Sequence, residues 1–329
     1  MVRALRVSAA VSLIMLTLSL TAVAGSPSTI VMRVAHCMPT THGYQIWIDK
    51  FAEELKARVG DRVEVKAFPN AQLGTETEYL EGMKLGTLDA AVLGRHGQVD
   101  TRLEVLNLPF IFRDVAHTDK VLRSGGELEQ LFNKILLEHG YVCLGWGELG
   151  FRHVTANKPV RSVADLKGLD IRIPNTPALL SAFKKWGANP TPLDFGELYT
   201  ALQQGVVKAQ ENPPEIIYTN KFYEVQKYMS LTAHANLACQ FLVSRRYWDT
   251  LPRDIQDAMI EAALIGRDYH LRMVRKANDE LIAKLEKAGM IVIRDVDRGS
   301  FLPGAREVHA EFASKIGADL IQKVAEAGK

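Results

Sequence analysis

Cysteine is scarce in this chain, and its number is odd. The 329 residues contain 3 cysteines, Cys37, Cys143 and Cys239. An odd number leaves at least one thiol unpaired within the chain, so no disulfide framework holds the fold. We interpret these cysteines as small buried hydrophobic residues rather than redox-active groups.

An excess of charge of one sign is also missing. The chain has 40 basic and 38 acidic residues, and Arg3 and Arg6 lie in an N-terminal segment that contains no acid. Without that segment the balance is 38 to 38. A net charge near zero argues against nucleic acid or an anionic membrane surface as the partner.

Motifs of the common catalytic and cofactor sites do not occur. There is no G-x-S-x-G, H-E-x-x-H, C-x-x-C or Walker A segment. The 9 histidines include no pair at metal-binding helical spacing. His36 and His42 are near in sequence, but the first ends an expected strand and the second enters an expected helix. We therefore predict no metal and no cofactor, and a binding function is favoured over catalysis.

An apolar run covers residues 9–24 at the N-terminus. Arg3 and Arg6 precede this run, and it ends on the small residues Ala22-Val-Ala24. The run is short for a membrane anchor and no stop-transfer charges follow it, so residues 1–24 are expected to be a cleavable signal peptide. Cys37 is too far from the cut to carry a lipid. The mature chain is expected to be free in the periplasm, without insertion into the membrane.

Strand and helix patterns alternate along the rest of the chain, which predicts an α/β fold with mainly parallel sheets. Expected strands cover 29–36, 62–68, 88–93, 142–146, 152–156, 169–174 and 206–211, and expected helices cover 76–85, 119–139, 179–186 and 195–204. Thr40 and Thr41 are candidate caps of a further helix that ends near Gly60. The longest helix is expected over about 252–287 with Thr250 as its cap, and its length of about 54 Å exceeds one domain. It should therefore lie across two domains.

The segment Gly145-Trp-Gly-Glu-Leu-Gly150 has the G-x-G-x-x-G spacing of a dinucleotide-binding turn. Such a turn needs a helix that opens after it, but β-branched residues and Pro159 follow. Asp170, near the position of a ribose-binding acid, begins an expected strand instead of ending one. NAD is also not available in the periplasm. The glycines are predicted to mark a flexible crossing between two domains, just before Arg152.

Arg172 stands in the apolar strand segment Leu169-Asp-Ile-Arg-Ile-Pro174. A buried arginine is costly unless it reaches a charged partner, and the carboxyl end of such a strand is where open α/β sheets bind ligands. A guanidinium can hold a carboxylate with two parallel hydrogen bonds. From the residues alone, a structural ion pair with a nearby acid is the other interpretation.

Several ordered segments resemble the solute-binding proteins of TRAP transporters, the DctP-like family, over essentially the whole mature chain. These segments are FPNAQLGTETEYLEGMKLGTLDAAV, LPFIF, GLDIRIPNTP, GANPTPLDFGELYTALQQGVV and QENPPEIIYTNKFYEVQKY. The resemblance implies a two-lobed periplasmic-binding-protein fold, with mixed, mainly parallel sheets and the long helix spanning both lobes. Lobe I is expected over 25–150 plus about 238–270, and lobe II over 151–237 plus about 271–329.

The resemblance also implies the binding residues. Arg172 is the expected main carboxylate contact, Arg152 is the second cationic contact, and Asn212 is expected to donate its side-chain amide to the same carboxylate. Other positions expected to line the pocket, or to vary with the ligand, are Asn175, Phe195, His36, Arg95 and His96. Glu76 and Glu78 are expected on a solvated helix face instead.

Two segments depart from the family's pattern. Lys208 and Ala209 stand where the family often has an acid and a glycine, which affects the local turn rather than the intact QENP segment. Gly94 and Gly97 stand near the positions where sialic-acid-binding members carry an acid and an arginine. Sialic acid is therefore not the expected ligand.

The predicted function is that of a periplasmic receptor for a small organic carboxylate, either a sugar acid or a C4-dicarboxylate. It would deliver this ligand to the small and large membrane subunits of a TRAP permease, driven by an ion gradient. Polar groups near His36, Arg95 and His96 favour a hydroxylated acid such as a uronate or an aldonate. The alternatives are a binding protein of an ATP-driven uptake system and a periplasmic enzyme that acts on a carboxylate.

Overall fold

Lobe I is built around a five-stranded mixed sheet. The structure is a computed structural model that describes residues 29–329, so the expected signal peptide lies outside the described residues. The strand order is β2-β1-β3-β10-β4, in which β1 pairs in parallel with β2 and β3, and β10 runs antiparallel to β3 and β4. These strands cover Ile30–Ala35 (β1), Val63–Phe68 (β2), Ala90–Leu93 (β3), Tyr141–Phe151 (β4) and Asn236–Ser244 (β10).

Lobe II is built around a six-stranded mixed sheet of order β11-β9-β5-β8-β6-β7. Strand β6 pairs in parallel with β7 and β8, whereas β5 runs antiparallel to β8 and β9. The strands are β5 (His153–Ala156), β6 (Asp170–Ile173), β7 (Asn189–Pro192), β8 (Ala209–Asn212), β9 (Tyr228–Ser230) and β11 (Ile291–Ile293). The α/β class with mixed sheets is confirmed.

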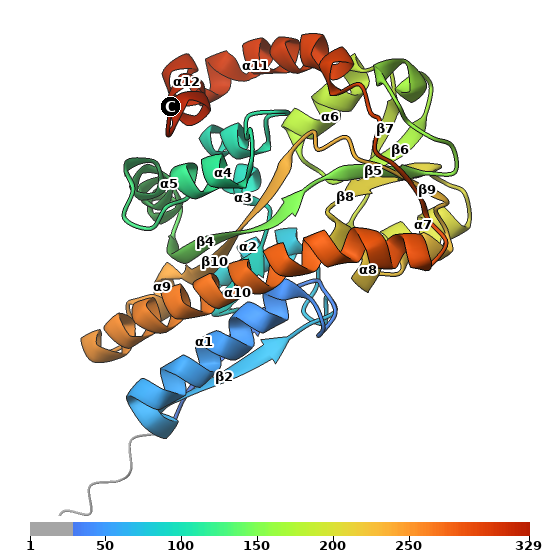
Figure 1. The fold of residues 1–329 in the computed structure, drawn as a ribbon. Helices are drawn as coiled ribbons and strands as arrows, with labels where there is room; N and C mark the ends of the chain where they lie inside the picture. The colour runs from blue at the N-terminus through green and yellow to red at the C-terminus, as the bar shows by residue number, and fades with distance from the viewer. Residues whose placement is uncertain (1–28) are drawn as a thin grey trace, which may run out of the picture.

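The long helix α10 (Arg253–Lys287) connects the two lobes. It packs on α1 (Gly43–Val59) and β4 of lobe I and on α8 (Pro214–Thr219) of lobe II, as Figure 1 shows. It also contacts β11 of lobe II. The chain also passes from β4 to β5 at residue 152 and from β9 to β10 over residues 231–235. The expected helix across both lobes is confirmed, while the lobe boundaries near 151, 238 and 271 stay predictions.

The helices of lobe I follow the expected pattern with two differences. The single helix expected over 119–139 is two helices, because Gly125 adopts a left-handed backbone (φ 73°) between them. Helix α1 is capped by the His42 side chain, which accepts from the Tyr44 amide, rather than by Thr40 or Thr41. The lobe I helices are α1 (Gly43–Val59), η1 (Gly60–Arg62), α2 (Glu76–Leu85), α3 (His96–Val99), η2 (Thr101–Asn107), α4 (Val115–Val121), α5 (Glu127–Glu138) and α9 (Arg245–Trp248).

The helices of lobe II are short, and the C-terminal helices reach back to lobe I. Helix α11 packs on α6 of lobe II and on η2 of lobe I, and α12 packs on η2. The cap of α10 is Pro252 and not Thr250, whose hydroxyl donates to the Tyr247 carbonyl instead. The remaining helices are η3 (Val163–Leu166), α6 (Pro177–Lys185), η4 (Phe195–Glu197), α7 (Leu198–Gln203), α8 (Pro214–Thr219), η5 (Phe222–Glu224), η6 (Arg298–Phe301), α11 (Leu302–Ile316) and α12 (Ala318–Glu326).

The glycines of the G-x-G-x-x-G segment lie inside β4 and permit close packing. A methyl group on Gly147 would stand 2.9 Å from Trp47 Cζ3 and 3.1 Å from His270 Cδ2. A methyl group on Gly266 of α10 would stand 3.0 Å from Trp47 Cδ1. The Trp47 ring stacks on His270 at 5.1 Å between centroids. Gly147 and Gly266 thus let α1, α10 and β4 approach one another. The expected crossing is found just after Gly150, where the chain passes from the first sheet to the second at residue 152, and its flexibility stays a prediction.

Hydrogen bonds connect residues of lobe I with residues of lobe II. Gln98 Nε2 of lobe I donates to the Asn175 carbonyl of lobe II at 3.3 Å. Glu215 at the start of α8 accepts from the Gly43 amide of α1 at 2.7 Å through Oε1. Its other oxygen is buried without a hydrogen-bond partner, 3.9 Å from His42 Nε2. Burial raises the pKa of Glu215 to about 7, although the Gly43 amide opposes the shift.

We expect Gly147→Ala to lower the free energy of unfolding by about 1–3 kcal/mol, because the added methyl overpacks the Trp47–His270 stack. Gly196→Ala is the matched control, since no atom lies within 4 Å of a methyl group there. Urea denaturation of both variants measures the difference. Equal stabilities would contradict the close-packing role of Gly147.

Glu215→Gln should change how stability depends on pH. The folded pKa of about 7 lies above the usual 4.5, so the unfolded state holds fewer protons between these values and Glu215 destabilises the fold as pH rises through them. The effect is on the order of 3 kcal/mol above pH 7. Urea unfolding at pH 5 and pH 7.5 should therefore show the Gln variant gaining stability relative to wild type as pH rises. Parallel pH curves would contradict the raised pKa, and exposed Glu307→Gln is the control.

Candidate functional site

A cavity of about 50 Å³ lies between the lobes and gathers most of the expected binding residues. We call it the interlobe cavity. The expected residues that line it are Arg95, Arg152, Arg172, Phe195 and Asn212. A larger cleft of about 590 Å³ lies elsewhere, lined by residues of α4, β4 and α10. We place the site in the smaller cavity because it is the one that holds the buried arginines.

Arg172 is the buried cation of β6, with 2% of its surface exposed. Its Nε and Nη2 donate to the Leu193 carbonyl at 3.0 and 2.8 Å, and its guanidinium carbon lies 6.0 Å from the centre of the Phe195 ring. Within residues 29–329 no acid forms an ion pair with it. Burial, together with the charges of Arg95 and Arg152, lowers the pKa of Arg172 to about 9. The alternative interpretation of Arg172 as half of a structural ion pair therefore finds no partner in the described chain.

Arg152 is neutralised within the protein. It forms an ion pair with Glu211 through Nε, and its Nη2 donates to Glu211 Oε1 at 2.7 Å and to Asn212 Oδ1 at 3.2 Å. His234 Nε2 lies 3.0 Å from the same carboxylate. Burial alone would raise the pKa of Glu211, but the charge of Arg152 and the hydrogen bonds from Arg152 and His234 lower it to about 2. Glu211 thus stays ionised and balances Arg152.

The charge of Arg95 is balanced by Glu76, whose position was predicted incorrectly from the sequence. Glu76 accepts from Arg95 Nε at 2.9 Å and from the Gly94 amide at 3.1 Å, and it lines the interlobe cavity. The expectation of a solvated helix face is wrong for Glu76 but correct for Glu78, which is exposed and completes the capping box with Thr75. The helix α2 therefore directs its first residue, not its third, toward the cavity.

Three expected residues do not line the interlobe cavity. His36 is buried and its Nε2 lies 2.9 Å from Gln45 Oε1. His96 is buried beside the Trp146 ring, and burial lowers its pKa to about 4. Asn175 is exposed, and its carbonyl forms the contact to Gln98 across the lobes.

Several polar residues that line the cavity were not predicted from the sequence, namely Tyr44, Asn107, Thr176 and Asn236. Asn212, which was expected, donates its amide to Gln210 Oε1 at 2.6 Å while its oxygen accepts from Arg152. Asn236 had one sequence signal, because it is the polar first residue of the otherwise largely apolar strand Asn236–Ser244. Tyr44, Asn107 and Thr176 are brought in by tertiary packing alone.

Over residues 29–329 no group of three His, Cys, Asp or Glu side chains is placed to hold a metal ion. In the same range no helix combines the length and the apolar character that crossing a membrane requires.

Comparisons with known proteins agree with this architecture. The chain matches the DctP family, "Bacterial extracellular solute-binding protein, family 7", over residues 34–315. It is 33% identical to the 2,3-diketo-L-gulonate-binding periplasmic protein YiaO of Escherichia coli, covering 90% of this chain and 91% of that protein. 

Solved structures of related proteins resemble this chain over its whole fold. A TRAP periplasmic solute-binding protein from Polaromonas sp. JS666 bound to D-erythronate has a TM-score of 0.88 at 32% identity, covering 91% of this chain and 99% of that one. One from Sulfurospirillum deleyianum with bound succinate has a TM-score of 0.86 at 30% identity, with coverages of 91% and 99%. The chain belongs to the DctP family of bacterial extracellular solute-binding proteins, the solute-binding proteins of TRAP transporters.

Proposed function

We propose that this protein is a periplasmic receptor that binds a small organic carboxylate in the interlobe cavity and delivers it to the membrane subunits of a TRAP permease. The observation that carries the proposal is Arg172, a buried guanidinium without an acidic partner in the described chain. A ligand carboxylate supplies the missing negative charge through a charge-assisted, bidentate hydrogen bond. The relatives are ligand-binding transport proteins, which agrees with binding rather than turnover.

Closure of the two lobes is the second part of the proposal. Arg172, Arg152 and Asn212 belong to lobe II or to its crossing segment, whereas Glu76 and Arg95 belong to lobe I. A ligand held between these groups bridges the lobes and stabilises the closed arrangement. Closure also removes water, and the lower dielectric strengthens the arginine–carboxylate attraction.

The class of ligand includes sugar acids and C4-dicarboxylates. D-Erythronate and succinate, which the two solved relatives hold, each have four carbons and at least one carboxylate. We propose Arg172, Arg152, Asn212, Phe195 and Arg95 as the contact residues, and roles for His36, His96 and Asn175 stay predictions.

A screen of small acids by thermal unfolding tests the proposal directly. A ligand at one hundred times its dissociation constant should stabilise the fold by about 2.7 kcal/mol, since it binds the folded state alone. Dicarboxylates, keto acids, uronates and aldonates form the panel, and their uncharged alcohols are the controls. A panel in which no acid raises the melting temperature would contradict the proposed function.

Arg172→Ala should weaken the binding of every acid that the wild type binds by at least a hundredfold. The reason is that the carboxylate loses its buried partner, a loss worth about 3–5 kcal/mol. Arg172→Lys should also bind poorly, because an ammonium group cannot form the paired hydrogen bonds. Titration calorimetry measures both, with exposed Arg253→Ala as the control. Affinities near wild type in Arg172→Ala would remove Arg172 from the site.

A further inference from the structure

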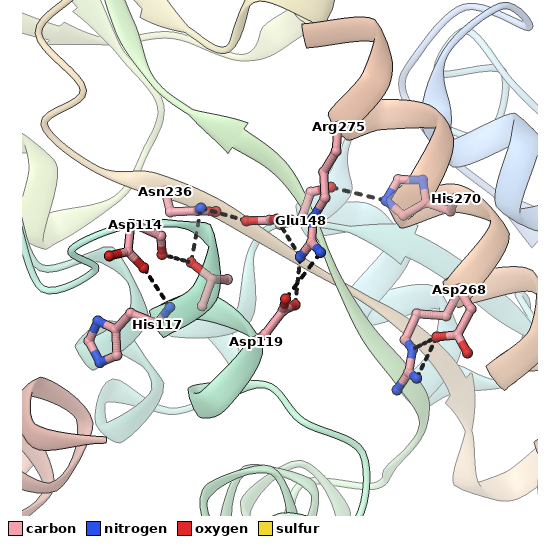
Figure 2. A network of polar contacts seen from close by, with 10 residues as sticks. Asp114, His117, Asp119, Glu148, Asn236, Asp268, His270 and Arg275 are labelled. Carbon is pink, nitrogen blue, oxygen red and sulfur yellow. Dashed lines mark hydrogen bonds and ion pairs between the residues drawn. The ribbon is translucent and has the colours of Figure 1, made fainter. Parts of the chain in front are cut away.

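Asn236 lines the interlobe cavity with one polar atom left unused. It is the first residue of β10 and is 1% exposed. Its Nδ2 donates to Glu148 Oε2 at 2.6 Å (Figure 2). The same nitrogen also donates to Thr118 Oγ1 at 3.2 Å. Its Oδ1 is buried and has no hydrogen-bond partner in the described structure. A buried acceptor without a partner is costly, so a ligand that supplies a donor gains by binding there.

A network behind Asn236 fixes which atom faces the cavity. Glu148 of β4 is 1% exposed, and its Oε1 accepts from Arg275 Nε of α10 at 2.8 Å. Arg275 also forms an ion pair with Asp119 at 2.6 Å (Figure 2). Burial raises the pKa of Glu148, but the charge of Arg275 and the hydrogen bonds from Asn236 and Arg275 oppose that shift. The carboxylate that this ion pair favours accepts hydrogen bonds and donates none, so it holds the amide nitrogen of Asn236 on its own side. The carbonyl oxygen is left as the atom that Asn236 offers to a ligand.

Arg95 supplies the complementary unused group. Its Nη1 is buried without a partner, and the residue lines the same cavity. The cavity therefore offers one unsatisfied donor and one unsatisfied acceptor in addition to Arg172. A ligand hydroxyl both donates and accepts, whereas a second ligand carboxylate only accepts and would place an anion against Asn236 Oδ1.

We propose that Asn236 is a specificity-determining residue that accepts a hydrogen bond from a ligand hydroxyl and so selects hydroxylated acids over unsubstituted dicarboxylates. This inference rests on the proposed function, since it concerns the same cavity, and it adds the class of acid. The selection follows the general rule that a site built to bond a hydroxyl rejects an analogue that leaves its polar group unpaired.

Three four-carbon acids provide matched probes. D-Erythronate carries hydroxyl groups, succinate carries a second carboxylate in their place, and butyrate carries neither. Titration calorimetry of the wild type should show D-erythronate bound at least tenfold more tightly than succinate or butyrate. Asn236→Leu keeps the size of the side chain and removes the acceptor, so it should lose at least tenfold for D-erythronate and less than threefold for succinate.

Gln240→Leu is the matched control variant. Gln240 lies on the same strand and also has a buried side-chain nitrogen without a partner, but it does not line the interlobe cavity. Its replacement should leave the ratio of the two affinities within threefold of wild type. If Asn236→Leu does not fold, two other measurements replace it. These are the affinities of Asn236→Ala for the same acids and the affinities of the wild type for 2-, 3- and 4-hydroxybutyrate. At least one of these monohydroxy acids should bind tenfold more tightly than butyrate.

The outcomes separate this inference from the proposed function. Equal losses for both acids in Asn236→Leu, or a wild type that prefers succinate, would overturn the role of Asn236 while binding through Arg172 still stands. Binding that survives Arg172→Ala, or no binding of any acid, would overturn the proposed function and this inference with it.

Discussion

The surplus of one positive charge in the interlobe cavity is the constraint on which the rest of this structure depends. Arg95, Arg152 and Arg172 are each at least nine-tenths buried, and Glu76 and Glu211 neutralise the first two. The half-exposed Asp194 lies a further 3.7 Å from Arg95 Nη2 and is not one of the buried charges. Arg172 keeps a carbonyl oxygen as its hydrogen-bond acceptor. Its lowered pKa expresses the cost of that arrangement, because burial and two like charges both disfavour the charged form. A carboxylate between the lobes removes this cost.

Close packing around α10 holds in place the elements that surround the interlobe cavity. Helix α10 approaches α1 and β4 closely because Gly147 and Gly266 leave room for the Trp47 ring. His270 of α10 connects the same elements, with its ring nitrogens 2.9 Å from the Gly43 carbonyl and 3.1 Å from the Glu148 carbonyl. Glu148, which orients Asn236, is thus held from both its backbone and its side chain. The frame that joins the lobes also positions a residue of the cavity.

Local sequence patterns predicted the features of the fold and of the site that depend on neighbouring residues in the chain. Helix α2 was expected at 76–85 and lies there, because Thr75, Glu78 and Gly86 provide its cap and its end. Arg172 was recognisable because a charged residue interrupts an apolar strand. The pairing of Arg152 with Glu211 was not predictable, since it depends on the antiparallel register of β5 and β8 between residues 59 positions apart. The cavity roles of Glu76 and Asn236 depend in the same way on how helices and strands of different lobes meet.

The balance of charges bears on the ligand independently of hydrogen bonding. With Arg95 and Arg152 already neutralised, one carboxylate brings the buried groups of the cavity to neutrality. A dianion would leave one negative charge in excess, close to Glu76, which lines the cavity and is paired with Arg95. An unpaired buried charge is strongly destabilising, so a dicarboxylate would have to take up a proton or keep one end in solvent. A monocarboxylate with hydroxyl groups requires neither, and it also satisfies the unused donor of Arg95 and the unused acceptor of Asn236.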